Sequence, residues 1–113
     1  MAGLIQCART LGFYVYHTAD ARRSEPGFPD LVAVHPTTGA VIMFECKAQR
    51  GRLRSSSMTK RGRWLPGQAD WLSAFQRAGI MAEVVKPNPQ GDAMGYDAAL
   101  ALLQHMARRT EAA

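Results

Sequence analysis

This sequence has little cysteine and no long apolar run, and one long stretch of it has no acidic residue. Only Cys7 and Cys46 are cysteines, and they lie far apart in the 113 residues. That spacing argues against a zinc knuckle or a paired-cysteine redox motif. It predicts two buried small side chains in a reducing, cytoplasmic compartment. No run approaches the roughly 18 apolar residues that span a bilayer, so no membrane partner is expected.

The stretch without acidic residues lies between Glu45 and Asp70. It holds seven of the fourteen lysine and arginine residues, namely Lys47, Arg50, Arg52, Arg54, Lys60, Arg61 and Arg63. The chain as a whole carries a formal net charge of +5. Because half of the cations gather in one acid-free segment, the sequence predicts a polyanionic partner, most often a nucleic acid.

The rest of the pattern predicts one α/β domain over residues 1–113. Apolar periodicity predicts helices over 3–11, 67–78 and 97–110, the last capped by Asp97. Aromatic and β-branched runs predict strands over 13–17, 31–34, 41–47 and 80–86, with a hairpin turn at 35–39. Residues 48–66 are predicted to be a long basic loop. This order predicts a mixed sheet flanked by helices.

Two carboxylates and a lysine lie at the ends of two predicted strands. Asp30 precedes the apolar run 31–34, and Glu45 and Lys47 end the run 41–47. In an antiparallel hairpin the start of one strand lies beside the end of its partner, so Asp30 and Glu45 are expected to be neighbours. Glu45 and Lys47 lie two residues apart and share a strand face, about 7 Å from one another. We expect this strand end to open into a cleft.

This arrangement suits a magnesium ion and phosphodiester hydrolysis. Mg²⁺ prefers oxygen ligands, and the two carboxylates with the backbone carbonyl of Cys46 would supply three. Lys47 would orient water or stabilise the charge on the reacting phosphate. The opposing interpretation is plain: a Glu-x-Lys tripeptide is common by chance, an aspartate after proline often ends a turn, and Glu beside Lys is often only a surface pair.

Several short motifs occur here in an order that resembles the VRR-NUC family of the PD-(D/E)xK nuclease superfamily. They comprise Tyr16-His17-Thr18, Arg22-Arg23-Ser24, Pro26-Gly27-Phe28-Pro29-Asp30-Leu31, Glu45-Cys46-Lys47, Gly51-Arg52-Leu53, Gln68 with Trp71-Leu72, and Ala78-Gly79. The resemblance covers most of residues 4–87. Small members from phages and bacteria are stand-alone nuclease domains.

The resemblance implies a restriction-endonuclease-like α-β-β-β-α-β core, here with an added C-terminal helix, and DNA endonuclease activity that depends on Mg²⁺ or Mn²⁺. It implies that Asp30 and Glu45 bind the metal and that Lys47 is the catalytic lysine. It also implies that Gln68, which opens the helix beside the site, belongs with these three to the catalytic residues. It also implies a homodimer acting on branched DNA in the manner of a Holliday-junction resolvase, in a bacterial or phage-infected cell.

The sequence departs from the family pattern at two places. The first helix offers Gln6 where the family usually carries a glutamate, and a neutral amide is a weaker metal ligand than a carboxylate. Residues 54–66 are inserted between the Gly-Arg-Leu motif and Gln68, adding four cations and Trp64. The insertion is interpreted as a DNA-contacting flap or a dimer arm, and the alternative is a solvated disordered loop.

Further residues are candidates for nucleic-acid contact. They are His17, Arg22, Arg23, Arg50, Arg52, Arg54, Lys60, Arg61 and Arg63. For His17 a structural role is an even alternative. Trp71 and Phe75, at helical spacing, are expected in the core rather than stacked on bases. His35 and His105 are expected to be bystanders.

Three functions therefore compete on sequence grounds. The first is a metal-dependent nuclease, which is the favoured hypothesis. The second is a catalytically weak or inactive nuclease fold that only binds nucleic acid, as the missing first-helix glutamate suggests. The third is a structural subunit that needs another chain for recognition.

Overall fold

Nine helices and strands follow one another along residues 1–18 and 25–108, the part of the chain that the computed structural model describes. They are α1 (Ala2–Thr10), β1 (Tyr14–His17), β2 (Leu31–Val34), β3 (Val41–Cys46), β4 (Ser57–Met58), β5 (Trp64–Leu65), α2 (Gln68–Arg77), β6 (Met81–Val85) and α3 (Tyr96–Ala107). Each predicted element begins within one residue of its expected start. The predicted α-β-β-β-α-β core with a C-terminal helix is confirmed, with β4 and β5 added between β3 and α2.

Four strands form one mixed sheet in the order β1-β2-β3-β6. Strands β1, β2 and β3 are antiparallel neighbours, and β6 joins β3 in parallel. The predicted hairpin between β2 and β3 is present, and its turn is closed by a bond from the His35 N–H to the carbonyl of Ala40. A parallel partner for β3 requires a crossover, and α2 lies in that connection.

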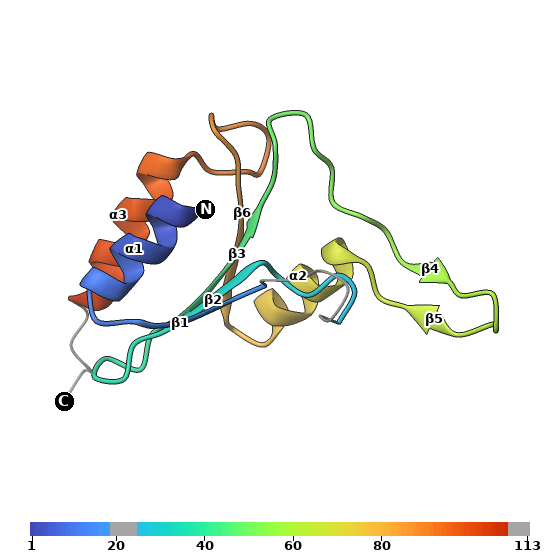
Figure 1. The fold of residues 1–113 in the computed structure, drawn as a ribbon, viewed down its shortest axis with the longest axis horizontal. Helices are drawn as coiled ribbons and strands as arrows, with labels where there is room; N and C mark the ends of the chain where they lie inside the picture. The colour runs from blue at the N-terminus through green and yellow to red at the C-terminus, as the bar shows by residue number, and fades with distance from the viewer. Residues whose placement is uncertain (19–24, 109–113) are drawn as a thin grey trace.

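Helices cover both faces of the sheet (Figure 1). Helices α1 and α3 lie side by side on one face, and α2 covers the other. The alternation of β3 divides the core accordingly: Ile42 and Phe44 pack towards α1 and α3, while Met43 packs towards Leu72 of α2. The third strand is therefore buried on both faces, which explains its nearly continuous apolar sequence.

The basic segment 48–66 is more ordered than a loop, which corrects the prediction. Strands β4 and β5 pair as an antiparallel ribbon, with Ser57 opposite Leu65 and Met58 opposite Trp64. Two residues per strand give too short a run for an alternating pattern to be read from the sequence. The segment projects away from the sheet and helices as a long arm (Figure 1). We call residues 54–66 the ribbon arm.

The start of the last helix also differs from the prediction. Gly95 occupies the N-cap position, and Asp97 lies in the first turn of α3 without capping it. An acidic residue there still interacts favourably with the positive end of the helix dipole. The helix ends at Ala107, and residues 109 and 110 of the predicted span lie outside the described residues. Among the helices described, none is long and apolar enough to cross a bilayer.

Candidate active site

Asp30 and Glu45 extend from neighbouring antiparallel strands at the same end of the sheet. Leu31 pairs with Phe44, so one step further along the ladder Asp30 lies opposite Glu45. The N–H of Cys46 donates a hydrogen bond to Oδ2 of Asp30 at 2.9 Å. The structure therefore brings together the two carboxylates that the hairpin topology placed side by side.

Glu45 is buried at the end of β3. Only 2% of its surface is accessible. Its Oε1 accepts a hydrogen bond from Nε2 of Gln68 at 2.7 Å, and Nζ of Lys47 lies 3.9 Å from the same oxygen. Its Oε2 is buried and receives no hydrogen bond from a donor group in the part of the chain that is described, and the carboxyl group of Asp30 lies within hydrogen-bonding reach of Glu45. An unpartnered buried carboxylate oxygen is costly, and that cost marks a site that a ligand can complete.

Burial and the neighbouring carboxylate both disfavour the ionised form of Glu45. Burial raises its pKa most, and the negative charge of Asp30 raises it further, while Lys47 lowers it. The result is a pKa of about 7, against an ordinary value of 4.5. A bound cation would offset the negative charge that the Asp30 and Glu45 carboxylates place side by side.

Lys47 faces a basic hollow beside the carboxylates. The hollow has a volume of about 280 Å³, and its lining includes Lys47, Arg52 and Lys86, with Asp92 as an acidic member. Three cations around one concavity suit the phosphates of a nucleic-acid backbone. Sequence reasoning missed Lys86, because it ends a different strand, and only the parallel pairing of β6 with β3 brings it here.

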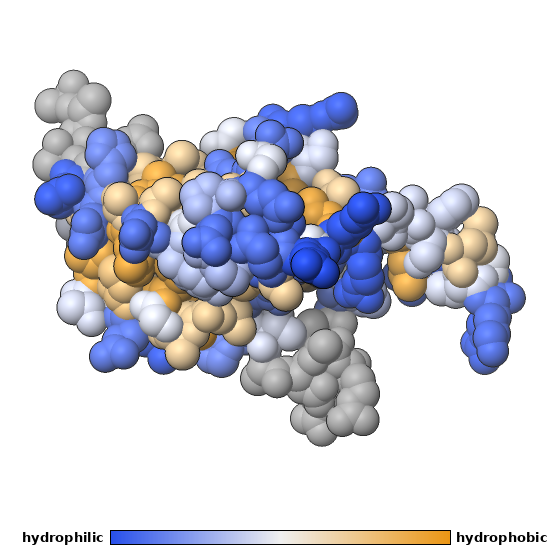
Figure 2. All heavy atoms as spheres, turned by 90° about the horizontal axis from the view of Figure 1, so that it is seen from above, coloured by the Kyte–Doolittle hydropathy of each residue, from blue (hydrophilic) through white to orange (hydrophobic). Residues whose placement is uncertain are grey.

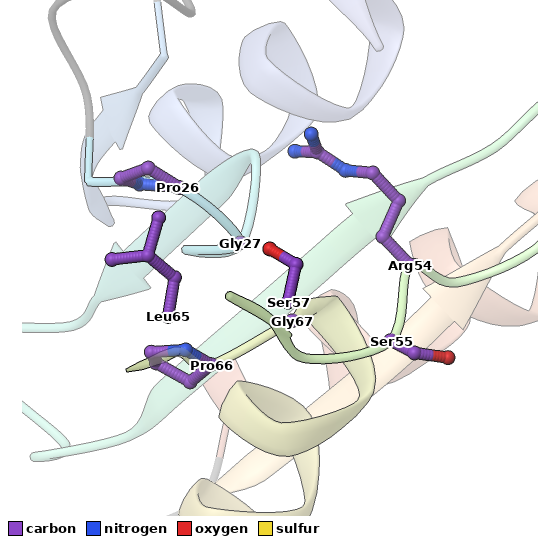
Figure 3. A pocket seen from close by; sticks show the side chains of 8 residues that line it. All are labelled: Pro26, Gly27, Arg54, Ser55, Ser57, Leu65, Pro66 and Gly67. Atoms are coloured by element: carbon purple, nitrogen blue, oxygen red, sulfur yellow. The ribbon is translucent and has the colours of Figure 1, made fainter. Parts of the chain in front are cut away.

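Gln68 joins the root of the ribbon arm to the buried carboxylate. Its Nε2 donates to Glu45, and its Oε1 accepts a bond from the N–H of Arg54 at 2.9 Å. The backbone beside it is closely packed, because a Cβ on Gly67 would collide with the backbone of Arg54 and Ser55. Figure 3 shows Arg54, Ser55 and Gly67 around the pocket at this root. The side-chain amide of Gln68 therefore connects the root of the ribbon arm to the carboxylate of Glu45.

We expect Gln68→Leu to destabilise the fold by about 3 kcal/mol. The substitution leaves the buried Oε1 of Glu45 without its neutral donor and the N–H of Arg54 without its acceptor. Urea unfolding at neutral pH measures the change. Gln104→Leu, at an exposed position of α3, is the control and should shift stability by no more than about 0.5 kcal/mol. Equal midpoints for the two variants would show that the Gln68 bonds contribute nothing.

The family model of the VRR-NUC domain matches residues 4–88, about three quarters of the chain. This chain belongs to the VRR-NUC domain family. Among solved structures, it is similar to Hjc, a Holliday junction resolvase from the archaeal hyperthermophile Archaeoglobus fulgidus. The identity is 21%, the TM-score is 0.44, and the match covers 79% of this chain and 67% of that one. A comparison with curated proteins found no significant match.

The residues of this VRR-NUC domain fit a divalent cation. Oε2 of Glu45 lacks a partner, and the carboxyl group of Asp30 lies close enough to raise the pKa of Glu45. The N–H of Cys46 faces Asp30, and in a strand the carbonyl of a residue points to the same side as its N–H. Oxygen donors of this kind suit Mg²⁺ or Mn²⁺. No cluster of three or more His, Cys, Asp or Glu side chains occurs among residues 1–18 and 25–108, so a third oxygen ligand would have to come from the backbone or from water.

The thiol of Cys46 lies on the core side of β3. Burial and the nearby Asp30 raise its pKa to about 11, so it stays protonated at neutral pH. Its side chain packs against the core formed with α1 and α3, as the alternation of β3 predicts. A thiol held in its protonated form is a weak nucleophile, which favours a packing role for this side chain.

The first-helix residue of the VRR-NUC pattern lies in a different hollow. Gln6 is exposed, and it lines a shallow concavity of about 440 Å³ with Arg9 and His17. His17 is half-buried at the end of β1, next to β2. Arg22 and Arg23 lie outside the described residues. The structure thus groups Gln6 with His17 and Arg9.

The cations predicted to contact nucleic acid lie on the surface. All six of the arginines and lysines between residues 50 and 63 are exposed: Arg50, Arg52, Arg54, Lys60, Arg61 and Arg63. In the part of the chain that is described, the one ion pair joins Lys47 to Glu45, so none of the six is neutralised there by an acidic side chain.

Three residues that were not expected to contact nucleic acid make structural contacts. His35 is buried, its Nε2 donates to the carbonyl of Leu11, and its Nδ1 accepts bonds from the turn backbone. Trp71 and Phe75 pack with Phe28 in an aromatic cluster, with ring centroids 5.3 to 5.9 Å apart. The Trp71 indole N–H donates to the carbonyl of Pro26, which holds the loop before Asp30 against α2.

Proposed function

We propose that this VRR-NUC domain is a Mg²⁺- or Mn²⁺-dependent nuclease that hydrolyses phosphodiester bonds in DNA. One observation carries the proposal: the buried Oε2 of Glu45 has no partner, although Asp30 and Lys47 lie beside the same carboxylate. A purely structural glutamate would be satisfied by hydrogen bonds at this depth. A cation site that the carboxylate helps to form would account for this buried oxygen without a hydrogen-bond donor.

Each residue then has a distinct role. Asp30, Glu45 and the carbonyl of Cys46 would hold the cation, which when bound acidifies water and neutralises phosphate charge. Lys47 places an ammonium group where the phosphate gains negative charge in the transition state. Gln68 is a positioning residue, because it fixes the rotamer of Glu45 by a 2.7 Å hydrogen bond.

The basic hollow next to Lys47 would receive the DNA backbone. Arg52 and Lys86 line it from the loop after β3 and the end of β6. Contacts to phosphate carry no sequence information, so we expect recognition of backbone and shape rather than of bases. Preference for branched DNA and action as a homodimer stay predictions that rest on the family resemblance.

Incubation of the purified protein with labelled DNA tests this proposal. Linear, nicked, flap and four-way-junction substrates are compared in Mg²⁺, in Mn²⁺ and in EDTA. We expect cleavage in either metal and none in EDTA, with binding retained throughout. Lys47→Ala should abolish cleavage while it preserves binding.

The second candidate is a nuclease fold that binds DNA without cutting it. The neutral, exposed amide of Gln6, in place of a first-helix carboxylate, is the observation that favours it. Binding without hydrolysis on every substrate, in both metals, would select this alternative.

A further inference from the structure

The outer turn of the ribbon arm is held in one conformation by hydrogen bonds. Its turn is closed by a bond from the Gly62 N–H to the carbonyl of Thr59 and by bonds from the Arg63 N–H to Oγ1 of Thr59 and from the Thr59 N–H to the carbonyl of Arg63. Gly62 has a φ of +82°, a conformation that suits glycine. This turn presents the side chains of Lys60 and Arg61 at the outer end of the arm.

Two large apolar side chains lie next to those cations. Met58 and Trp64 are cross-strand partners in the ribbon, and they are 50% and 63% exposed. A ribbon with two residues in each strand has little stability of its own, so an exposed apolar pair on it is best explained by a partner that covers it. Figure 2 shows hydrophilic side chains gathered at the far end of the arm, beside hydrophobic ones.

The charge of the arm decides what that partner is. The arm carries Arg54, Lys60, Arg61 and Arg63 and no acidic residue. Two arms of two copies laid together would bring cations against cations, which is repulsive. A phosphate backbone is attractive instead, and the major groove of duplex DNA is wide enough to admit a two-stranded ribbon.

We propose that the ribbon arm is a second DNA-binding element, which grips duplex DNA away from the cleaved phosphate. Lys60, Arg61 and Arg63 would contact backbone phosphates, and Met58 and Trp64 would lie against the groove. This inference rests on the proposed nuclease function. From the root at Arg54 to the turn at Thr59 the chain spans at most roughly 17 Å, the length of about five base pairs.

The position of the arm root supports this arrangement. The N–H of Arg54 is bonded to Gln68, which in turn is bonded to the carboxylate of Glu45. The arm therefore begins at the candidate active site and projects outward from it (Figure 1). DNA whose scissile phosphate lies by Lys47 would pass along the arm on one side of the cut.

The salt dependence of DNA binding tests the proposal. The double variant Lys60→Gln/Arg61→Gln leaves Thr59, Gly62 and the turn backbone unchanged. Each lost phosphate contact lowers the slope of log affinity against log salt by about 0.9, so we expect a slope smaller by about 2 and a loss of affinity of about 50-fold at 0.1 M salt. The control, Arg77→Gln/Arg108→Gln, removes the same charge from exposed positions outside the arm and should keep the slope.

These titrations use a 30-base-pair duplex in EDTA, so their result is independent of cleavage. An unchanged slope in the arm variant overturns the proposal, even if the protein proves to be an active nuclease. A smaller slope supports it, even if no cleavage is found on any substrate.

Photo-crosslinking identifies the partner directly. With p-benzoylphenylalanine in place of Trp64, irradiation of the protein–DNA complex should yield a protein–DNA adduct. An adduct only between two protein chains would assign the arm to dimerisation and overturn the proposal. The absence of any adduct would overturn it as well.

Discussion

Asp30→Asn is expected to lower metal-dependent DNA cleavage by about 1,000-fold or more, while the protein stays folded. The asparagine amide oxygen can still accept the hydrogen bond from the N–H of Cys46, so the sheet end keeps its geometry. What is lost is one of the two anionic ligands proposed for the cation. Removal of a single contact to the transition state typically lowers a reaction rate by about two to three powers of ten. Loss of the metal ion would remove several such contacts at once.

Cleavage of a labelled duplex under single-turnover conditions in Mg²⁺ measures this effect. Asp97→Asn is the matched control, because Asp97 is an exposed aspartate in the first turn of α3. This variant should cleave DNA at the wild-type rate. Without metal, Asp30→Asn should be slightly more stable than the wild type, because a like charge next to Glu45 is gone. Equal cleavage by the two variants would refute the role of Asp30.

The metal-free wild-type protein is expected to lose stability as the pH rises from about 4.5 to about 7, because of Glu45. In the folded state its pKa is raised to about 7, and in the unfolded chain it takes the ordinary value of 4.5. Between these values the folded state binds the proton and the unfolded state does not, so rising pH favours unfolding. At about 1.4 kcal/mol per pKa unit, the loss is on the order of 3 kcal/mol.

Urea unfolding in EDTA at several pH values, for the wild type and Glu45→Gln, isolates this contribution. Other carboxyl groups titrate in both proteins, so the difference between them reports Glu45. As the pH rises, the free energy of unfolding of the wild type should fall relative to that of Glu45→Gln. Mg²⁺ at pH 8 should stabilise the wild type only. A difference that does not change with pH would show that Glu45 is not held in this environment.

The order of helices and strands was predictable because it depends on local patterns. Alternation and β-branched runs marked β2 and β3, and the turn between them required a hairpin. The neighbouring positions of Asp30 and Glu45 followed from that hairpin alone, since antiparallel pairing sets the register from the turn outward. The short strands β4 and β5 escaped detection because two residues carry no period.

What the sequence determined by itself is therefore the order of the main elements, the hairpin of β2 and β3, the pair of carboxylates with Lys47, and the gathering of cations in one segment. All of these depend on residues close along the chain or joined by one turn. The tertiary structure alone decided that Glu45 is buried, that Gln68 ties it to the root of the ribbon arm, and that Lys86 lines the hollow beside Lys47. These features depend on how α2 and β6 pack against β3, and such long-range packing leaves no local signal in the sequence.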